Sequence, residues 1–342
     1  MSRGPLAAAV VGATGYAGLS LVHLLASHGG VRLARLTSRS FAGRPLAAAF
    51  PLLGLEGEFA TELEPGGFDV VFSCLPHGVS SGRCAAWLES GAAVIDMSAD
   101  FRLHDAALYA SWYKSPHPAP GLLGEAVLGL PELHAAEIAE ARLVAVPGCY
   151  STAAILALAP AVAAGLAGAD VVVDAKSGVS GAGRSPALGV HFSEVNESVT
   201  AYQVGGHRHL PEITQELEGV AERAGTLPPR VTFVPHLVPM TRGILVTCYM
   251  DLGCPPERLA AAYRDFYAGQ PFVTVVDGPP STKLVSHTNH CLVNVSWQGP
   301  KAVVTAALDN LVKGASGQGV ECFNLAFGFD RAEALGGTVQ WP

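Results

Sequence analysis

The chain has 342 residues and a formal net charge of −8, and only 15% of its residues are charged, so it is long enough for two domains and too apolar to be a disordered chain. The negative charge disfavours a nucleic acid or an anionic membrane surface as a partner. The seven cysteines are odd in number and irregularly spaced, which argues against a disulfide framework. They include no C-x-x-C pair, which argues against a structural zinc site. We therefore expect reduced thiols in a cytoplasmic protein.

The N-terminal part predicts a dinucleotide-binding unit. Residues 6–11 have the length of a buried strand and lead into the turn Gly12-Ala13-Thr14-Gly15-Tyr16-Ala17-Gly18, which a helical pattern follows. Glycines there allow a tight turn and the close approach of a pyrophosphate to the helix N-terminus. The spacing is G-x-x-G-x-x-G rather than G-x-G-x-x-G, so a turn that only packs is the alternative. The predicted cofactor contacts in this turn are Gly12, Thr14, Gly15, Tyr16, Ala17 and Gly18.

The end of the second predicted strand, 31–36, indicates which cofactor is bound. An NAD site would have Asp or Glu there to bind the ribose hydroxyls, whereas this chain reads Thr37-Ser38-Arg39-Ser40. Hydroxyls and a guanidinium favour a 2′-phosphate, so we predict NADP(H) and contacts from Ser38 and Arg39. The alternative is that Arg39 is an ordinary solvated loop residue.

Further strands are predicted at 69–73, 93–96 and 143–146, and polar residues follow the first two. His77 comes after the first and Arg102 after the second, at the edge where an open parallel sheet binds its ligand. Arg102 is a candidate contact for an anion, and the alternative is a surface arginine paired with Asp100 or Asp105. Later apolar runs lie close together and predict a mixed or antiparallel sheet, with strands at 171–175, 231–234, 244–250, 272–276, 291–297 and 302–307 and helices at 212–224 and 255–268.

Cys149 lies between the predicted strand at 143–146 and an Ala/Leu-rich segment that predicts a helix from Ala153. Free N–H groups and the helix dipole stabilise an anion at such a position, and for a cysteine this anion is the thiolate. Cys149 is therefore a candidate nucleophile. The alternative is a small buried thiol that packs at the end of a strand.

The stretch His207-Arg208-His209-Leu210-Pro211-Glu212 offers groups for acid–base chemistry. If 207–209 is extended, both imidazoles face one side, and Glu212 can orient one of them. A thiolate could then attack an activated carbonyl to form a thioester, a nicotinamide could deliver hydride, and an imidazolium could protonate the oxyanion. The alternatives are a helix-capping turn with solvated rings and a metal site, which nothing in the spacing requires.

Six motifs occur in order along nearly the whole chain: the turn at 12–18, Ala99-Asp100-Phe101-Arg102, Pro147-Gly148-Cys149-Tyr150, the glycine-rich stretch 177–184, the stretch 207–212, and Asp309-Asn310-Leu311-Val312-Lys313-Gly314. Together they resemble the N-acetyl-gamma-glutamyl-phosphate reductases, which are NADPH enzymes of arginine biosynthesis related to aspartate-semialdehyde dehydrogenase. That family usually has Thr where this chain has Leu210, and we expect little consequence.

The resemblance implies an α/β fold with a Rossmann-type parallel-sheet domain for NADP at 1–148, joined by a C-terminal helix at about 314–342. It implies a second α/β domain, α+β-like with a mixed sheet, at 149–313, which carries the catalytic cysteine and assembles homodimers or homotetramers. The roles that it implies are a nucleophile, Cys149; an acid/base, His209, with Glu212 behind it; a phosphate or substrate contact, His207; and contacts with anionic parts of the substrate, Arg102 and Arg184. We further expect Ser151 to contact the substrate and Asn310 to contact the cofactor, with no metal.

The leading function is the reduction of N-acetyl-L-glutamyl 5-phosphate to the 5-semialdehyde with release of phosphate. One alternative is the lysine-pathway reductase that acts on an aminoadipyl phosphate attached to an acidic carrier protein. The net charge and the few cations near the proposed site favour a free small molecule instead. A second alternative is an NADP-sensing protein without catalysis, which would not need Cys149, His209 and Glu212 together.

Overall fold

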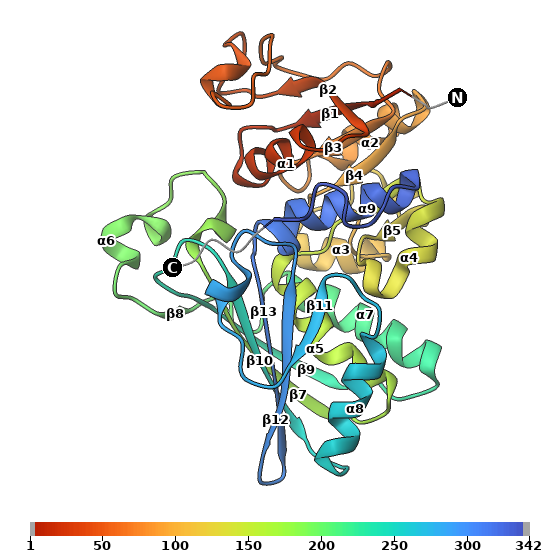
Figure 1. Ribbon diagram of the computed structural model, residues 1–342, viewed down its shortest axis with the longest axis vertical. Coiled ribbons are helices and arrows are strands. Elements are labelled where there is room, and N and C mark those ends of the chain that lie inside the picture. The colour runs from red at the N-terminus through yellow and green to blue at the C-terminus, as the bar shows by residue number, and fades with distance from the viewer. Residues whose placement is uncertain (1–3, 338–342) are drawn as a thin grey trace. The chain divides into compact units, whose positions relative to one another are not determined.

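The computed structural model describes residues 4–337 (Figure 1). These residues form two compact units: unit 1 contains residues up to 147 and residues 315–336, and unit 2 contains residues 148–314 and residue 337. No helix in the described part of the chain is both long and apolar enough to cross a membrane.

Unit 1 contains a six-stranded parallel sheet in the order β2-β1-β3-β4-β6-β5, which confirms the predicted Rossmann-type sheet. The strand order reverses between β1 and β3, so the turns that follow these two strands flank the position where such sheets bind nucleotides. The strands are β1 (Leu6–Val11), β2 (Val31–Thr37), β3 (Val70–Ser73), β4 (Ala93–Asp96), β5 (Ala126–Leu128) and β6 (Leu143–Ala145).

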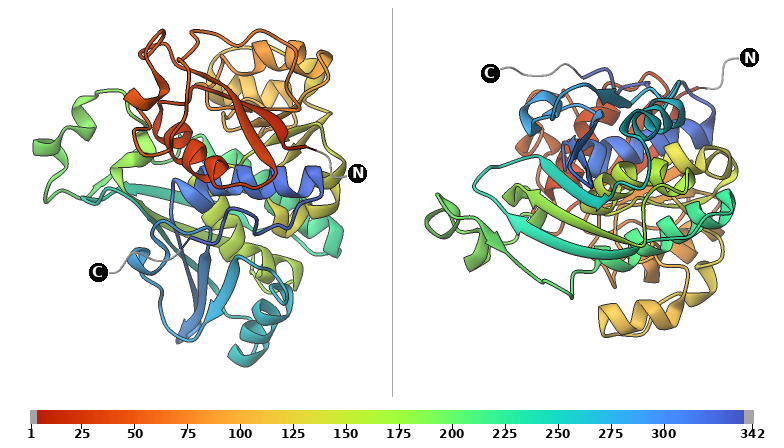
Figure 2. Two further views of the ribbon diagram at one scale, coloured as in Figure 1. Left: turned by 45° about the horizontal axis from the view of Figure 1, so that its top comes forward. Right: turned by 90° about the horizontal axis from the view of Figure 1, so that it is seen from below.

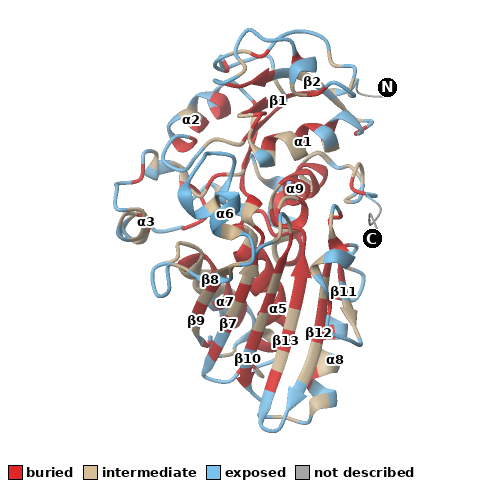
Figure 3. Cartoon of the chain, turned by 90° about the vertical axis from the view of Figure 1, so that its left-hand side faces the viewer, coloured by how far each residue is buried: buried red, intermediate tan, exposed pale blue. Residues whose placement is uncertain are grey.

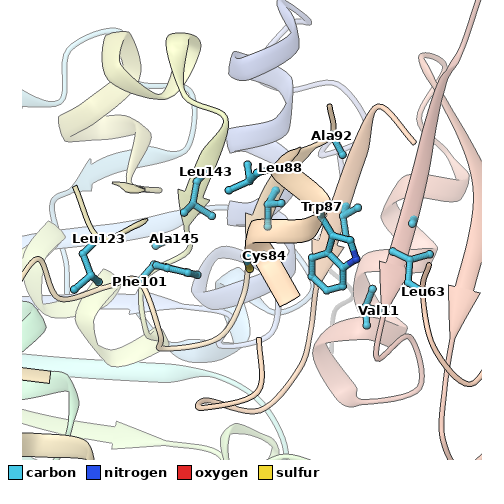
Figure 4. Packing of buried hydrophobic residues seen from close by; sticks show 13 residues of the cluster. Val11, Leu63, Cys84, Trp87, Leu88, Ala92, Phe101, Leu123, Leu143 and Ala145 are labelled. Carbon is cyan, nitrogen blue, oxygen red and sulfur yellow. The ribbon is translucent and has the colours of Figure 1, made fainter. Parts of the chain in front are cut away.

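Helices cover both faces of this sheet, because successive strand residues point to opposite sides. On one face Trp87 packs in a buried cluster with Val11 and Val71 (Figure 4). On the other face Phe72 contacts Phe323, with ring centroids 5.6 Å apart. The helices of unit 1 are α1 (Tyr16–Ala26), α2 (Ser81–Glu89), α3 (Ala106–Tyr113), α4 (Pro131–Glu140) and α9 (Gly317–Phe327).

The C-terminal helix is shorter than predicted. A π-helical turn spans Val312–Ser316, and α9 ends at Phe327 because Gly328 adopts a left-handed conformation with φ 73°. Residues 328–337 are not helical, and the Asn324 amide donates hydrogen bonds to the carbonyl oxygens of Arg331 and Glu333 in this segment. The prediction of a helix to 342 is therefore wrong for 328–337, and 338–342 lie outside the described residues.

Unit 2 contains a seven-stranded sheet in the order β11-β12-β13-β10-β7-β9-β8, which confirms the predicted mixed sheet. Parallel pairs occur at β7–β9 and β11–β12, and the other neighbours are antiparallel. The strands are β7 (Asp170–Ser177), β8 (Thr200–Ala201), β9 (Arg230–Leu237), β10 (Ile244–Asp251), β11 (Val273–Val276), β12 (Cys291–Gln298) and β13 (Lys301–Leu308).

Helices α5 (Cys149–Ala163), α7 (His209–Ala224) and α8 (Pro256–Phe266) pack on the same face of the sheet of unit 2 (Figure 2). Nearly every residue of α5 is buried, because α7, α8 and the sheet surround it. This explains why α5 is apolar on all sides. The short helix α6 (Phe192–Val195) lies in the long segment between β7 and β8.

Candidate active site

In the turn between β1 and α1, glycines allow backbone segments to lie closer together than a side chain would permit. Gly12 has φ +81°, and a Cβ atom there would lie 2.8 Å from the carbonyl oxygen of Cys74; one at Gly18 would overlap the carbonyl oxygen of Gly12. Gly15 caps α1 without a side-chain hydrogen bond. A Cβ at Gly15 would meet nothing closer than 3.6 Å. This combination fits a pyrophosphate at the N-terminus of α1.

Ser38 ties the glycine turn to the loop that follows β2. Its hydroxyl lies 2.6 Å from the hydroxyl of Thr14, and both residues are buried. The Ser38 oxygen also accepts the N–H of Phe41 at 3.2 Å. Arg39 is exposed beside it, as is Tyr16 at the start of α1, and Ala17 is half-buried. The structure thus brings the predicted cofactor residues of unit 1 to one edge of the sheet, and their contacts with NADP(H) stay predictions.

Cys149 is the first residue of α5, with Gly148 as the extended N-cap residue. The helix begins four positions before the predicted Ala153, which places the thiol in the first turn, at the positive end of the helix dipole. Glu212 Oε2 accepts the Gly148 N–H at 3.1 Å and the Ser151 hydroxyl at 2.7 Å. Since Glu212 is 1% exposed, a buried carboxylate fixes the residues on both sides of the thiol.

The condition of an extended segment at 207–209 is not met. Arg208 has helical angles, φ −63° and ψ −16°, because α7 begins at His209. The two imidazoles nevertheless lie side by side, with centroids 4.7 Å apart. They are not solvated in the manner of a simple capping turn, since both rings pack edge-on against Tyr150, at 5.7 Å for His207 and 5.9 Å for His209.

His207 is a neutral imidazole in this setting. Burial lowers its pKa to about 4, and Arg208 acts in the same direction, whereas Glu212 acts to raise it. Nδ1 of His207 accepts the backbone N–H of His209 at 3.2 Å, so the ring proton of the neutral form is on Nε2. His207 can therefore donate one hydrogen bond to a ligand without carrying a charge.

His209 lies against the residue before the cysteine. A Cβ atom at Gly148 would overlap the His209 ring at Nε2 and Cδ2. Glycine at this position therefore allows the imidazole to approach the start of α5. The sequence contained a signal for this role, the glycine of Pro147-Gly148-Cys149-Tyr150, but a single sequence does not reveal the distant ring that requires it.

Tyr150 also contributes to the site, although the sequence assigned it no role. Its hydroxyl donates to the carbonyl of His236 at 2.9 Å and receives a long contact from the Tyr202 hydroxyl at 3.5 Å. Burial, with Tyr202 and Cys149 in support, raises the pKa of Tyr150, so the phenol stays neutral. The ring then forms a fixed surface for both histidines.

The structure places the remaining predicted residues in supporting positions. Ser151 is fully buried on Glu212, which gives it a positioning role, and a contact with substrate stays a prediction. Arg102 is buried rather than on the surface, and it contacts main-chain oxygens: Nε donates to the Val146 carbonyl at 2.8 Å, and Nη2 donates to the Met97 carbonyl at 3.0 Å. Arg184 is exposed on the loop after β7.

Asn310 is likewise held within unit 2. Its Oδ1 accepts the Gly243 N–H at 2.7 Å, and its Nδ2 donates to the Ser180 hydroxyl at 2.9 Å. These bonds secure the glycine-rich loop after β7. A contact between Asn310 and the cofactor stays a prediction.

The chain matches known proteins over both units. Residues 7–141 match the semialdehyde dehydrogenase NAD binding domain, and residues 149–310 match the semialdehyde dehydrogenase dimerisation domain. Among solved structures, aspartate semialdehyde dehydrogenase II of Vibrio cholerae, complexed with ASA, has a TM-score of 0.71 at 16% identity and covers 95% of this chain and 99% of its own. Aspartate semialdehyde dehydrogenase with NADP from Candida albicans has a TM-score of 0.70 at 17% identity, covering 94% and 98%. These likenesses show a shared fold.

Sequence relatives are much closer. An N-acetyl-gamma-glutamyl-phosphate reductase of Dehalococcoides mccartyi is 48% identical over 98% of this chain and 98% of the relative. Proteins of the same name from Heliobacterium modesticaldum and Pseudomonas savastanoi pv. phaseolicola are 47% and 46% identical and cover 98% and 97% of this chain and 99% and 98% of their own. The chain therefore belongs to the N-acetyl-gamma-glutamyl-phosphate reductase family.

Proposed function

We propose that the protein reduces N-acetyl-L-glutamyl 5-phosphate to N-acetyl-L-glutamate 5-semialdehyde with NADPH, releases phosphate, and serves arginine biosynthesis in the cytoplasm. The name shared by the relatives supports this substrate. The observation that carries the proposal is the arrangement at the start of α5, where Glu212 holds Gly148 and Ser151 on either side of Cys149 and the His209 ring lies against Gly148.

The turn at 12–18 and the loop after β2 support NADP(H) as the cofactor. Gly15 begins α1 without a side chain, which suits the approach of a pyrophosphate to the helix N-terminus. Ser38 and Arg39 occupy the position where an NAD site has an acid, and an acid would repel a 2′-phosphate. When bound, NADPH supplies the hydride that reduces the acyl carbon. In this proposal the protein's own groups form the acyl-enzyme, exclude water and move the proton.

Cys149 forms the covalent bond in the first step. The thiolate attacks the carbonyl carbon of the acyl phosphate, a C–S bond forms, the C–O bond to phosphate breaks, and phosphate leaves with that electron pair. The position of Cys149 in the first turn of α5 favours the thiolate. His207, neutral and able to donate from Nε2, is a suitable contact for a phosphate oxygen, and Arg102 and Arg184 stay candidates for further contacts with anions.

His209 supplies the proton. As the acyl carbon is reduced, negative charge develops on its oxygen, and the protonated imidazole donates its proton there to give a neutral hemithioacetal on Cys149. The imidazole takes this proton back as the C–S bond breaks and the carbonyl forms again, so the products are the aldehyde and the Cys149 thiolate. His209 suits this role better than His207, because the pKa of about 4 leaves His207 without a proton to give near neutral pH. Glu212 fixes the start of α5 and favours a nearby positive charge.

The experiment that tests the assignment is the reverse reaction. Purified protein is mixed with NADP, phosphate and either N-acetylglutamate semialdehyde or the carrier-bound aminoadipate semialdehyde, and NADPH formation is followed by absorbance. We expect a higher kcat/KM for the free N-acetylated aldehyde. A higher value for the carrier-bound aldehyde would overturn the substrate, and no phosphate-dependent turnover with either would overturn the activity in favour of a protein that only senses NADP.

We further propose that the protein is a homodimer or homotetramer and that its copies meet through the face of the unit 2 sheet opposite α5, α7 and α8. Buried and half-exposed residues alternate along β10 and β13 (Figure 3). Val172 on β7 and Tyr249 on β10 pair directly in the ladder and are each 39% exposed on this face. The match of 149–310 to a dimerisation domain favours a second copy as the partner. Val172→Lys with Tyr249→Lys should yield monomers in light scattering, and an unchanged mass would exclude this face.

A further inference from the structure

Gly314 lies against the proposed nucleophile, although the two are distant in the sequence. A Cβ atom at Gly314 would be 2.7 Å from Cβ of Cys149, 3.3 Å from its Cα and 3.3 Å from Cδ1 of Leu308. Real Cβ contacts do not occur at the first of these distances. Any side chain at 314 must therefore displace Cys149 or the segment that carries Gly314.

That segment is held in place by Asp309, which is fully buried. Its Oδ1 accepts the N–H groups of Leu311 at 2.8 Å and Val312 at 3.1 Å, and its carbonyl accepts the Gly314 N–H at 2.9 Å. The last bond spans five residues, as in a π-helix, and begins the π-helical turn Val312–Ser316. These hydrogen bonds therefore fix the position of the Gly314 backbone.

Contacts from elsewhere in unit 2 fix this turn further. Arg242 pairs with the Asp309 carboxylate at 3.1 Å, and the His287 N–H donates to it at 2.7 Å. The Lys313 ammonium, also buried, lies 5.6 Å from the centroid of the Phe272 ring. The turn therefore has little freedom to retreat from an added methyl group, and Cys149 would have to move instead.

We infer that Gly314 is a positioning residue for Cys149: the π-helical turn presents a residue without a side chain, and this defines where the cysteine side chain lies and leaves room for its acyl group. The inference rests on the proposed function only in calling Cys149 the nucleophile. The contact itself is independent of any substrate.

The kinetic test is Gly314→Ala, with Gly253→Ala as the matched control, because a Cβ at Gly253 would meet nothing within 4 Å. We expect Gly314→Ala to lower kcat on the order of 100-fold, as a displacement of about 1 Å does at a reacting centre. The KM for NADP(H) should stay unchanged, and alkylation of Cys149 by iodoacetamide should change in rate. Gly253→Ala should match the wild type. A folded Gly314→Ala protein with wild-type kcat and alkylation rate would overturn the inference.

A double-mutant cycle decides the matter even if Gly314→Ala unfolds the protein. Cys149→Gly removes the Cβ atom that an alanine at 314 would meet, so Gly314→Ala should destabilise this background less than the wild type in urea unfolding. If Gly314→Ala alone does not fold, the double variant should fold. Equal destabilisation in both backgrounds, or unfolding in both, would show that Cys149 is not what excludes a side chain. This cycle uses no substrate, so its result is separate from whether the wild type reduces an acyl phosphate.

Discussion

The carboxylate of Glu212 accepts the Ser151 hydroxyl at 2.7 Å, two residues after Cys149 in the first turn of α5. Together with the bond from the Gly148 N–H, this contact makes α7 the support of the nucleophile's helix. Glu212, which the sequence suggests for orienting a histidine, therefore positions the residues on both sides of the cysteine, and its role toward His209 stays a prediction.

Glu212→Gln tests this support. The substitution keeps the shape of the side chain but removes its charge and replaces one acceptor oxygen with a donor, so we expect kcat to fall on the order of 100-fold with little change in the KM for NADP(H). Ser151→Ala is the milder comparison, because it removes one hydrogen bond and leaves the charge, and we expect a loss on the order of 10-fold. Wild-type kcat in Glu212→Gln would refute a role for the carboxylate.

Substitutions of the two histidines should change different kinetic constants. His207→Asn should mainly raise the KM for the acyl phosphate, because a neutral side chain that donates a hydrogen bond is replaced by a shorter one. Since the pKa of His207 is lowered to about 4, its removal should leave the pH dependence of kcat between pH 6 and 8 unchanged. His209→Asn should mainly lower kcat. Steady-state kinetics across this pH range check both, and exchanged phenotypes would exchange the roles.

Arg39 should set the preference for NADPH over NADH. Arg39 is exposed after β2, and loss of a charge-assisted bond to a 2′-phosphate costs about 1.5–3 kcal/mol, which corresponds to a decrease of about 10- to 150-fold in the preference. The matched control is Arg32→Ala, an exposed arginine near the other end of the same strand. Steady-state constants for both cofactors measure the effect, and an Arg39→Ala protein that keeps the full preference would show that another group binds the phosphate.

Asp96, buried at the end of β4, should make the stability of the protein depend on pH. Burial raises its pKa to about 6, although hydrogen bonds from Ser98 and Ser80 oppose this shift. Between about pH 4 and pH 6 the folded protein holds a proton that the unfolded chain has lost, so this group's contribution to the free energy of unfolding falls as the pH rises, by up to about 3 kcal/mol.

Asp96→Asn should therefore gain stability relative to the wild type as the pH is raised from 4 to 7, measured by urea unfolding at several pH values. Asp277→Asn changes a fully exposed side chain, so the free energy of unfolding of this control variant should depend on pH as that of the wild type does. A difference between Asp96→Asn and wild type that stays constant across this range would show that Asp96 does not titrate as described.

Local features of the site were predictable from the sequence, because neighbouring residues determine them. The glycine turn at 12–18 follows β1 and opens α1 as expected, since short-range sterics at Gly12 and Gly18 decide that geometry. Most strands of both sheets were recognisable from apolar runs of strand length, whereas the two short edge strands β5 and β8 were missed. The start of α5 was missed by four residues, because its N-terminal capping comes from Glu212 on a different helix.

Features that depend on contacts between distant segments were not predictable. The two adjacent imidazole rings pack against Tyr150, and the His207 ring also packs against Phe233; both aromatic residues lie elsewhere in the chain. The end of α9 is a different case, because it follows a local signal, the left-handed Gly328 after the helix, which the prediction of a helix to 342 overlooked. The approach of Gly314 to Cys149 joins the first helix of unit 2 to its last turn, and no local pattern encodes it.

The most direct measurement of the central claim is a single turnover without NADPH. Protein is mixed with N-acetylglutamyl phosphate, phosphate release is followed in time, and the peptide that contains Cys149 is analysed by mass spectrometry. The thioester mechanism requires a burst of phosphate equal to the number of active sites and the N-acetylglutamyl group on Cys149, with neither in Cys149→Ser. Phosphate release only after NADPH is added, or an acyl group on another residue, would contradict it.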